Sequence, residues 1–104
     1  MGKSNPFKAE TLFLREFSKA YTNEIEFEPS IEWEMRTFEI WLPDIFHALT
    51  RGVVISSEIE EACSVWIVEG ETCDEDRLLI TLEVVCVKYR MCVTKIKMFR
   101  RVKR

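Results

Sequence analysis

The segment 78–99 constrains the fold more than any other part of the chain, because its polar and apolar residues alternate as in a β-hairpin. Folding this segment about a three-residue loop at 88–90 places Glu83 opposite Lys95. The other facing pairs of this register are Thr81 with Lys97, Ile80 with Met98, Leu82 with Ile96, Val84 with Thr94, and Cys86 with Cys92. A shift of one residue would mix the two faces, so the pattern predicts a register as well as a hairpin.

The composition predicts a soluble domain with one hydrophobic core. The chain has 104 residues, 47% of them apolar, and no apolar run reaches the roughly 18–20 residues of a membrane span. Its first residues lack the apolar stretch of a secretion signal. Four cysteines without CxxC spacing accompany a single histidine, so we expect reduced cysteines, no metal site and no cofactor. These features predict a cytoplasmic protein without a membrane partner.

The first forty residues predict a helix followed by a strand. Apolar residues at helical spacing indicate a helix from Pro6 to about Thr22, with a core stripe of Ala9, Leu12, Phe13, Phe17, Ala20 and Tyr21. Glutamates then alternate with apolar residues, which predicts a strand at Ile31–Ile40 with a negative, solvated face.

The middle of the chain predicts two short helices. Pro43 and Gly52 suit the first turn and the cap of a helix at 42–52. Ser57 and Glu60 form a capping box for a second helix that ends near Trp66, and a short strand at 67–69 then leads through an acidic turn to the hairpin. The order predicts a single α+β domain at residues 1–104, with an N-terminal helix, two short helices and an antiparallel β-meander ending in the C-terminal hairpin.

Charge is segregated along the chain. Residues 1–76 carry 17 acidic and 6 basic residues, whereas residues 77–104 carry 9 basic residues and one acidic residue, Glu83. Clustered cations with an aromatic residue among them are typical of a surface that binds nucleic acid, and the candidates are Lys88, Tyr89, Arg90, Lys95 and Lys97. The alternative is that the acidic segment 24–39 lies over the basic strands and pairs with them.

His47 and Arg51 are the candidate catalytic residues. They lie four residues apart, hence about one turn apart on similar faces of the predicted helix. An imidazole can take a proton from a ribose hydroxyl, and a guanidinium can hold a phosphate through two parallel hydrogen bonds. The alternative is that His47 has a capping or surface role.

The segment Phe46-His47-Ala48-Leu49-Thr50-Arg51-Gly52-Val53-Val54-Ile55-Ser56 resembles the His-Ala-Leu-x-Arg-x-x-x-Ile-Ser opening of domain of unknown function family 4258. The resemblance extends over about residues 43–99. Members of that family are similar in layout to RelE- and MqsR-type toxins, small α+β ribonucleases that cleave messenger RNA and are neutralised by an antitoxin. The resemblance implies that His47 and Arg51 match the family's characteristic positions and that basic residues on the sheet hold RNA.

Two functions follow as hypotheses. The first is a bacterial or phage RelE/MqsR-like domain that binds RNA through the hairpin and acts as a metal-independent endoribonuclease, with an antitoxin as its protein partner. The second is a non-enzymatic module whose acidic strand or aromatic helix docks another protein. The salt dependence of binding distinguishes them, because contacts with phosphate weaken steeply as salt rises.

Overall fold

The computed structural model describes residues 6–85 and 90–100, and over these residues it confirms the α+β class. The helices are α1 (Lys8–Ala20), α2 (Pro29–Phe38) and α3 (Leu42–Arg51), with a 3₁₀ turn at Thr22–Glu24. The strands are β1 (Ile25–Phe27), β2 (Val53–Glu60), β3 (Cys63–Glu71), β4 (Arg77–Val85) and β5 (Arg90–Phe99). Strands β2 to β5 form an antiparallel meander, and β1 adds to its far edge in parallel with β5.

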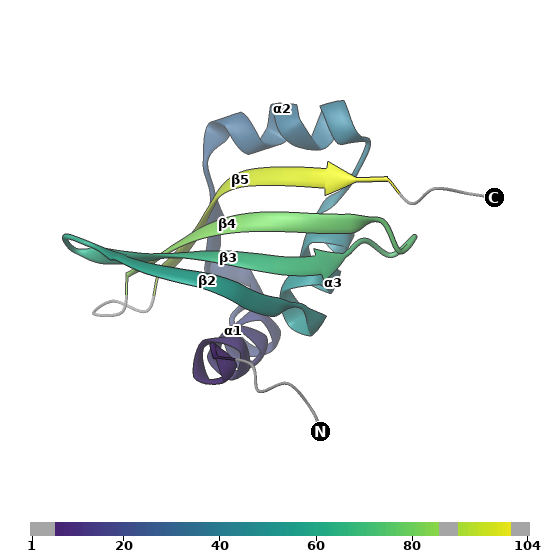
Figure 1. Cartoon of the computed structure of the whole chain (residues 1–104). Helices are drawn as coiled ribbons and strands as arrows, with labels where there is room; N and C mark the ends of the chain where they lie inside the picture. Colours follow the sequence, from purple (N-terminus) through teal and green to yellow (C-terminus); the bar gives the residue numbers. More distant parts are fainter. Residues whose placement is uncertain (1–5, 86–89, 101–104) are drawn as a thin grey trace, which may run out of the picture.

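The sheet has one covered face and one open face. In Figure 1, α3 lies behind the sheet, α1 runs back from below its β2 edge and α2 runs along its β5 side, and none of the described helices crosses the face toward the reader. The covered face and the helices share one hydrophobic core, in which Leu14, Ile45 and Leu82 are fully buried. Side chains alternate along a strand, so every second residue of β3, β4 and β5 points to the open face.

Helix α1 lies where the sequence predicts it, but the predicted core stripe is offset. Its buried residues are Thr11, Leu14, Phe17 and Ser18, whereas Leu12 and Tyr21 are 51% and 56% exposed. The Thr11 hydroxyl accepts a hydrogen bond from the Val54 backbone N–H at 3.0 Å, which explains why a polar residue faces the sheet. The stripe prediction counted aromatic residues as core and did not allow for a buried, satisfied threonine.

The predicted strand at Ile31–Ile40 is wrong, because helix α2 occupies this segment. Pro29 begins the helix, and Ile31, Met35 and Phe38 place their side chains on one side, with Ile31 fully buried. Glu39, with φ of 56°, ends it in the left-handed conformation. The glutamates between these apolar positions produced the apparent period of two.

The predicted helix at Ser57–Trp66 is also wrong, because β2 and β3 form a hairpin there. Val54, Trp66 and Val68 are buried on alternate positions of paired strands, and Ser57 lies opposite Trp66. The β-branched and aromatic residues of both segments favour a sheet surface. This strand content outweighs the capping box that Ser57 and Glu60 would form at a helix start.

The C-terminal hairpin is confirmed, but its predicted register is wrong. Thr81 lies opposite Lys95 and Glu83 opposite Cys92, so Glu83 and Lys95 are not partners. A β-bulge shifts the register between Thr81 and Leu82, which lets Val93 and Ile96 both face the core. Cys86 of the predicted Cys86–Cys92 pair lies outside the described residues. So do residues 88 and 89 of the predicted loop.

Candidate functional site

A pocket of about 780 Å³ opens at the end of the sheet where β3 turns into β4. It brings together both predicted catalytic residues, His47 and Arg51. The rest of its lining comes from the start of β2, the end of β3, the following turn and the start of β4, and comprises Gly52, Val53, Glu69, Gly70, Glu71, Thr72, Cys73, Glu75 and Arg77.

Close backbone packing holds α3 against the sheet beside this pocket. A Cβ atom on Gly70 would lie 2.8 Å from the Ala48 carbonyl oxygen and 2.9 Å from the Ala48 Cα atom, so only glycine allows this approach. The C-terminal end of α3 is fixed by Arg15 of α1, whose Nε donates to the Gly52 carbonyl at 3.0 Å and whose Nη2 donates to the Arg51 carbonyl at 3.1 Å. The backbone that carries His47 and Arg51 is therefore anchored on two sides.

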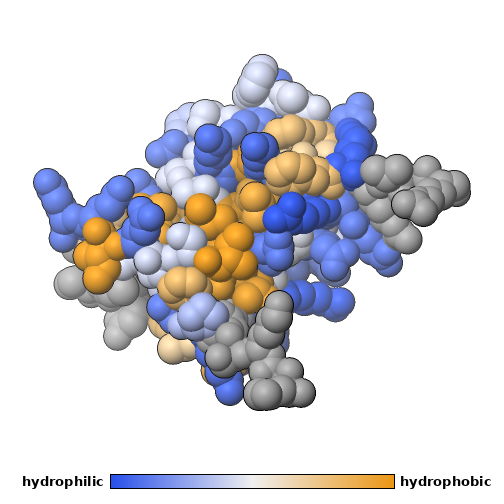
Figure 2. Space-filling view, in the orientation of Figure 1, coloured by the Kyte–Doolittle hydropathy of each residue, from blue (hydrophilic) through white to orange (hydrophobic). Residues whose placement is uncertain are grey.

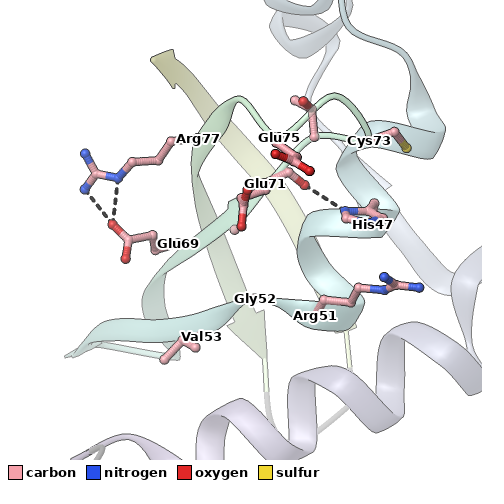
Figure 3. Close-up of a pocket in the computed structure, with 11 residues that line it drawn as sticks. His47, Arg51, Gly52, Val53, Glu69, Glu71, Cys73, Glu75 and Arg77 are labelled. Carbon is pink, nitrogen blue, oxygen red and sulfur yellow. Dashed lines mark hydrogen bonds and ion pairs between the residues drawn. The ribbon is translucent and has the colours of Figure 1, made fainter. Parts of the chain in front are cut away.

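The His47 ring is oriented by a hydrogen bond to the backbone of β3. Its Nδ1 atom lies 2.9 Å from the Glu71 carbonyl oxygen (Figure 3). A carbonyl oxygen can only accept a hydrogen bond, so Nδ1 carries the proton. In the neutral ring, Nε2 then has a free lone pair that can accept a proton. This arrangement fits a general base, and it also fits a structural tie between α3 and β3.

The turn between β3 and β4 is held in place by Asp44 and Thr72. Asp44 accepts backbone hydrogen bonds from Trp41 at 3.1 Å and from Cys73 at 3.0 Å, which joins the start of α3 to the turn. The buried Thr72 hydroxyl accepts the backbone N–H groups of Asp74 and Asp76. These contacts position Glu71 and Glu75 beside His47.

Local desolvation alone would raise the pKa of Asp44, but the two backbone hydrogen bonds outweigh it and lower the pKa below the usual 3.8. A carboxylate with a depressed pKa contributes stability above its unfolded-state pKa and loses it as the pH falls through its folded-state pKa. We therefore expect Asp44→Asn to cost about 1 kcal/mol at pH 7. This difference from the unmodified protein should shrink toward pH 3. Urea unfolding at pH 7, 5 and 3 measures it, and an equal cost at all three pH values would contradict the assignment.

Arg51 and Arg77 are the arginines that line the pocket, and the charge of Arg77 is paired with Glu69. In Figure 3 the Arg51 side chain extends away from the Glu69–Arg77 ion pair, whose closest N–O distance is 2.6 Å. Arg77 lines the pocket and also contacts Phe99, because its guanidinium carbon lies 5.0 Å from the centre of the Phe99 ring. Arg77 thus connects the pocket with the open face of the sheet.

The predicted nucleic-acid-binding residues do not form one cluster. Lys95 and Lys97 are exposed on the open face of β5, opposite Thr81 and Leu79, and neither has an ion pair with another described residue. Arg90 is held by Glu26, at 2.7 Å. Its ladder partner Val85 lies eight residues along β4 from Arg77, a distance of about 26 Å, so Arg90 is at the opposite end of these strands from the pocket. Lys88 and Tyr89 lie outside the described residues.

The predicted pairing of acidic segment and basic strands is therefore partial. Glu26 pairs with Arg90, and Glu39 lies 3.5 Å from Arg100, so two arginines of the C-terminal part are neutralised by the segment 24–39. Lys95 and Lys97 are exposed, and none of the described acidic residues forms an ion pair with them. Figure 2 shows the result on the open face, where an apolar area over the middle strands is bordered by hydrophilic side chains.

Cysteine chemistry and metal binding receive no support from the described residues. Desolvation and the nearby Asp44 carboxylate raise the pKa of the Cys73 thiol, so it is a poor nucleophile near neutral pH. Within residues 6–85 and 90–100, no three His, Cys, Asp or Glu side chains gather as metal ligands. No helix in these ranges is long and apolar enough to span a membrane.

Sequence reasoning missed Arg77 and Phe99, which the sheet register places side by side next to the pocket. Both lie at the ends of strands, and the true register is the signal that would have identified them. Comparisons with protein-family models, with curated proteins and with solved structures found no match.

Proposed function

We propose that this protein binds RNA on the open face of its sheet and cleaves it at the His47 pocket, as a metal-independent endoribonuclease of the RelE/MqsR type. One observation carries the proposal. Lys95 and Lys97 lie on the open face of β5, and Arg77 connects this face with the pocket. Lys95 and Lys97 are exposed and have no ion pair with any acidic residue that the structure describes, so they provide the positive charge that phosphate contacts require.

The proposed chemistry uses the free lone pair of His47. Nε2 takes the proton of a ribose 2′-hydroxyl while that oxygen bonds to the neighbouring phosphorus atom. The bond between phosphorus and the 5′-oxygen breaks, and the 5′-oxygen takes a proton from water. Arg51 holds the reacting phosphate and stabilises the charge that develops on it. The products are a 2′,3′-cyclic phosphate and a 5′-hydroxyl.

The acidic residues of the pocket weaken its attraction for the phosphates of RNA. Glu69 is neutralised by Arg77, but Glu71 also lines the pocket and would repel phosphates. The proposal therefore assigns most of the binding energy to the lysines of β5, and only the reacting phosphate to the pocket.

Reversing both lysine charges tests RNA binding directly. We expect Lys95→Glu with Lys97→Glu to weaken the affinity for single-stranded RNA by on the order of 10- to 100-fold and to reduce the slope of log affinity against log salt by about 2. The matched control is Lys8→Glu with Lys19→Glu, which makes the same change in net charge at exposed positions of α1. Fluorescence anisotropy at several salt concentrations measures both variants.

Equal losses in the two variants would show that only the net charge matters, and would contradict a binding site on β5. No RNA affinity of the unmodified protein at low salt would overturn the proposal.

A second candidate function is protein docking, and exposed tryptophans favour it. Trp33 on α2 and Trp41 before α3 are 70% and 72% exposed. Trp41 also lines an apolar pocket of about 330 Å³ with Met35 and Ile40. This surface would suit a protein partner such as an antitoxin. Binding there should depend weakly on salt, whereas RNA binding should weaken steeply.

A further inference from the structure

We infer that Phe99 is a stacking platform for one base of single-stranded RNA, placed beside the His47 pocket. This inference rests on the proposed function and names the class of substrate, an unpaired strand. The observation behind it is that the Phe99 ring lies on the open face next to two cations, Arg77 on the neighbouring strand and Lys97 on the same strand.

The contacts of Phe99 set it apart from the other exposed aromatic residues. Phe99 is 39% exposed and lies directly opposite Arg77 in the β4–β5 ladder. The Arg77 guanidinium carbon is 5.0 Å, and the Lys97 Nζ atom 5.4 Å, from the centre of its ring. Cations at such distances are attracted to the ring and stay close to it. A base that stacks on Phe99 therefore displaces at least one of these cations from the ring face, and the displaced cation pairs with a phosphate next to that base.

The position of Phe99 relates the stacked base to the reaction. Arg77 belongs to the lining of the pocket and also contacts Phe99, so a base on the ring lies one side chain away from the pocket. Lys97 and Lys95 continue along β5 at intervals of two residues, roughly 7 Å apart. An extended strand can therefore follow β5 with its phosphates on the lysines and enter the pocket next to the base held by Phe99.

The same geometry selects against duplex RNA. Bases in a duplex are already stacked and paired, so they cannot lie on an external aromatic ring without being unpaired. An unpaired strand presents every base as a flat surface, and stacking on an aromatic residue does not depend strongly on base identity. We therefore expect a preference for single strands and little sequence specificity from this residue.

The test compares Phe99→Leu with Tyr21→Leu, which removes an exposed aromatic ring at the residue that follows α1. The ligands are a single-stranded RNA octamer, the duplex of the same sequence, and inorganic polyphosphate, which has charges but no bases. Phe99→Leu should weaken octamer binding by about 10-fold and leave polyphosphate binding unchanged. Phe99→Trp should retain octamer binding, and Tyr21→Leu should change neither ligand.

A fluorescent 2-aminopurine base in the octamer gives a second measurement that does not depend on affinity. Stacking quenches its emission, so we expect quenching by the unmodified protein and by Phe99→Trp, and much less by Phe99→Leu at saturation. Unchanged quenching and affinity in Phe99→Leu would overturn the stacking platform. If the lysine reversal still weakened binding, RNA binding itself would stand and only the role of Phe99 would fall.

Equal loss of octamer and polyphosphate binding in Phe99→Leu would also overturn the inference, because it would mean that Phe99 only supports Arg77 and Lys97.

Discussion

Replacing His47 by asparagine is expected to lower the rate of RNA cleavage by about 10²- to 10⁴-fold, the usual contribution of a general base. The asparagine side-chain amide can still donate a hydrogen bond to the Glu71 carbonyl, which His47 holds at 2.9 Å through Nδ1. It has no counterpart of the Nε2 lone pair. The substitution therefore removes the proposed base and preserves the contact between α3 and β3.

His47→Ala is the partner variant that separates the two roles of the residue. It should lose cleavage to the same extent, and should also lose about 1 kcal/mol of stability because the Glu71 carbonyl loses its donor. Cleavage is measured with a labelled single-stranded RNA and stability by urea unfolding. Full activity in His47→Asn would show that His47 is only a structural tie, and a cleavage defect that follows stability in both variants would contradict catalysis.

Replacing Gly70 by alanine is expected to destabilise the fold by about 2–3 kcal/mol, within the range for overpacking a well-packed core. The added Cβ atom would lie 2.8 Å from both the Cβ and the carbonyl oxygen of Ala48. Two of the three nearest atoms belong to the helix backbone, so a side-chain rotation cannot relieve the contact. Helix α3 would have to move away from β3, and with it His47 would move away from Glu71.

Ser56→Thr is a matched control for Gly70→Ala, because it also adds a methyl group to a strand residue but does so on the open face of β2. We expect the control to change stability by less than about 0.5 kcal/mol. Urea unfolding of both variants provides the comparison. A Gly70→Ala variant as stable as the unmodified protein would contradict the close approach of α3 and β3.

The α+β class could be predicted from the sequence, but the type of secondary structure predicted for two segments is wrong. Segment 31–40 was expected as a strand and is helical, whereas segment 57–66 was expected as a helix and forms a hairpin. In the first segment, glutamates between apolar residues imitate the period of two that is typical of a strand. The buried position of Ile31 shows which side of the helix faces the core, and this position is known only from the structure. In the second, pairing with β3 and β4 outweighs the local capping signal. Long-range sheet contacts are invisible to short-range patterns.

The candidate site was predicted in part. The helical spacing of His47 and Arg51 predicts that they lie on one side of α3, and both line one pocket. The register of the last hairpin depends on a β-bulge between Thr81 and Leu82, which alternation alone does not indicate. That error hid the pairing of Arg77 with Phe99. It also paired Lys95 with Glu83, which would have neutralised a lysine that is free of ion pairs with the described residues.

The central claim is that RNA lies on the open face of β4 and β5 and reaches the His47 pocket. Titration of the ¹⁵N-labelled protein with a single-stranded RNA octamer at low salt, followed by backbone NMR shifts, tests it most directly. The claim predicts the largest shifts at Lys95, Lys97 and Phe99, with smaller ones at His47 and Glu71. Shifts confined to α2 and Trp41, or no shifts at all, would contradict it.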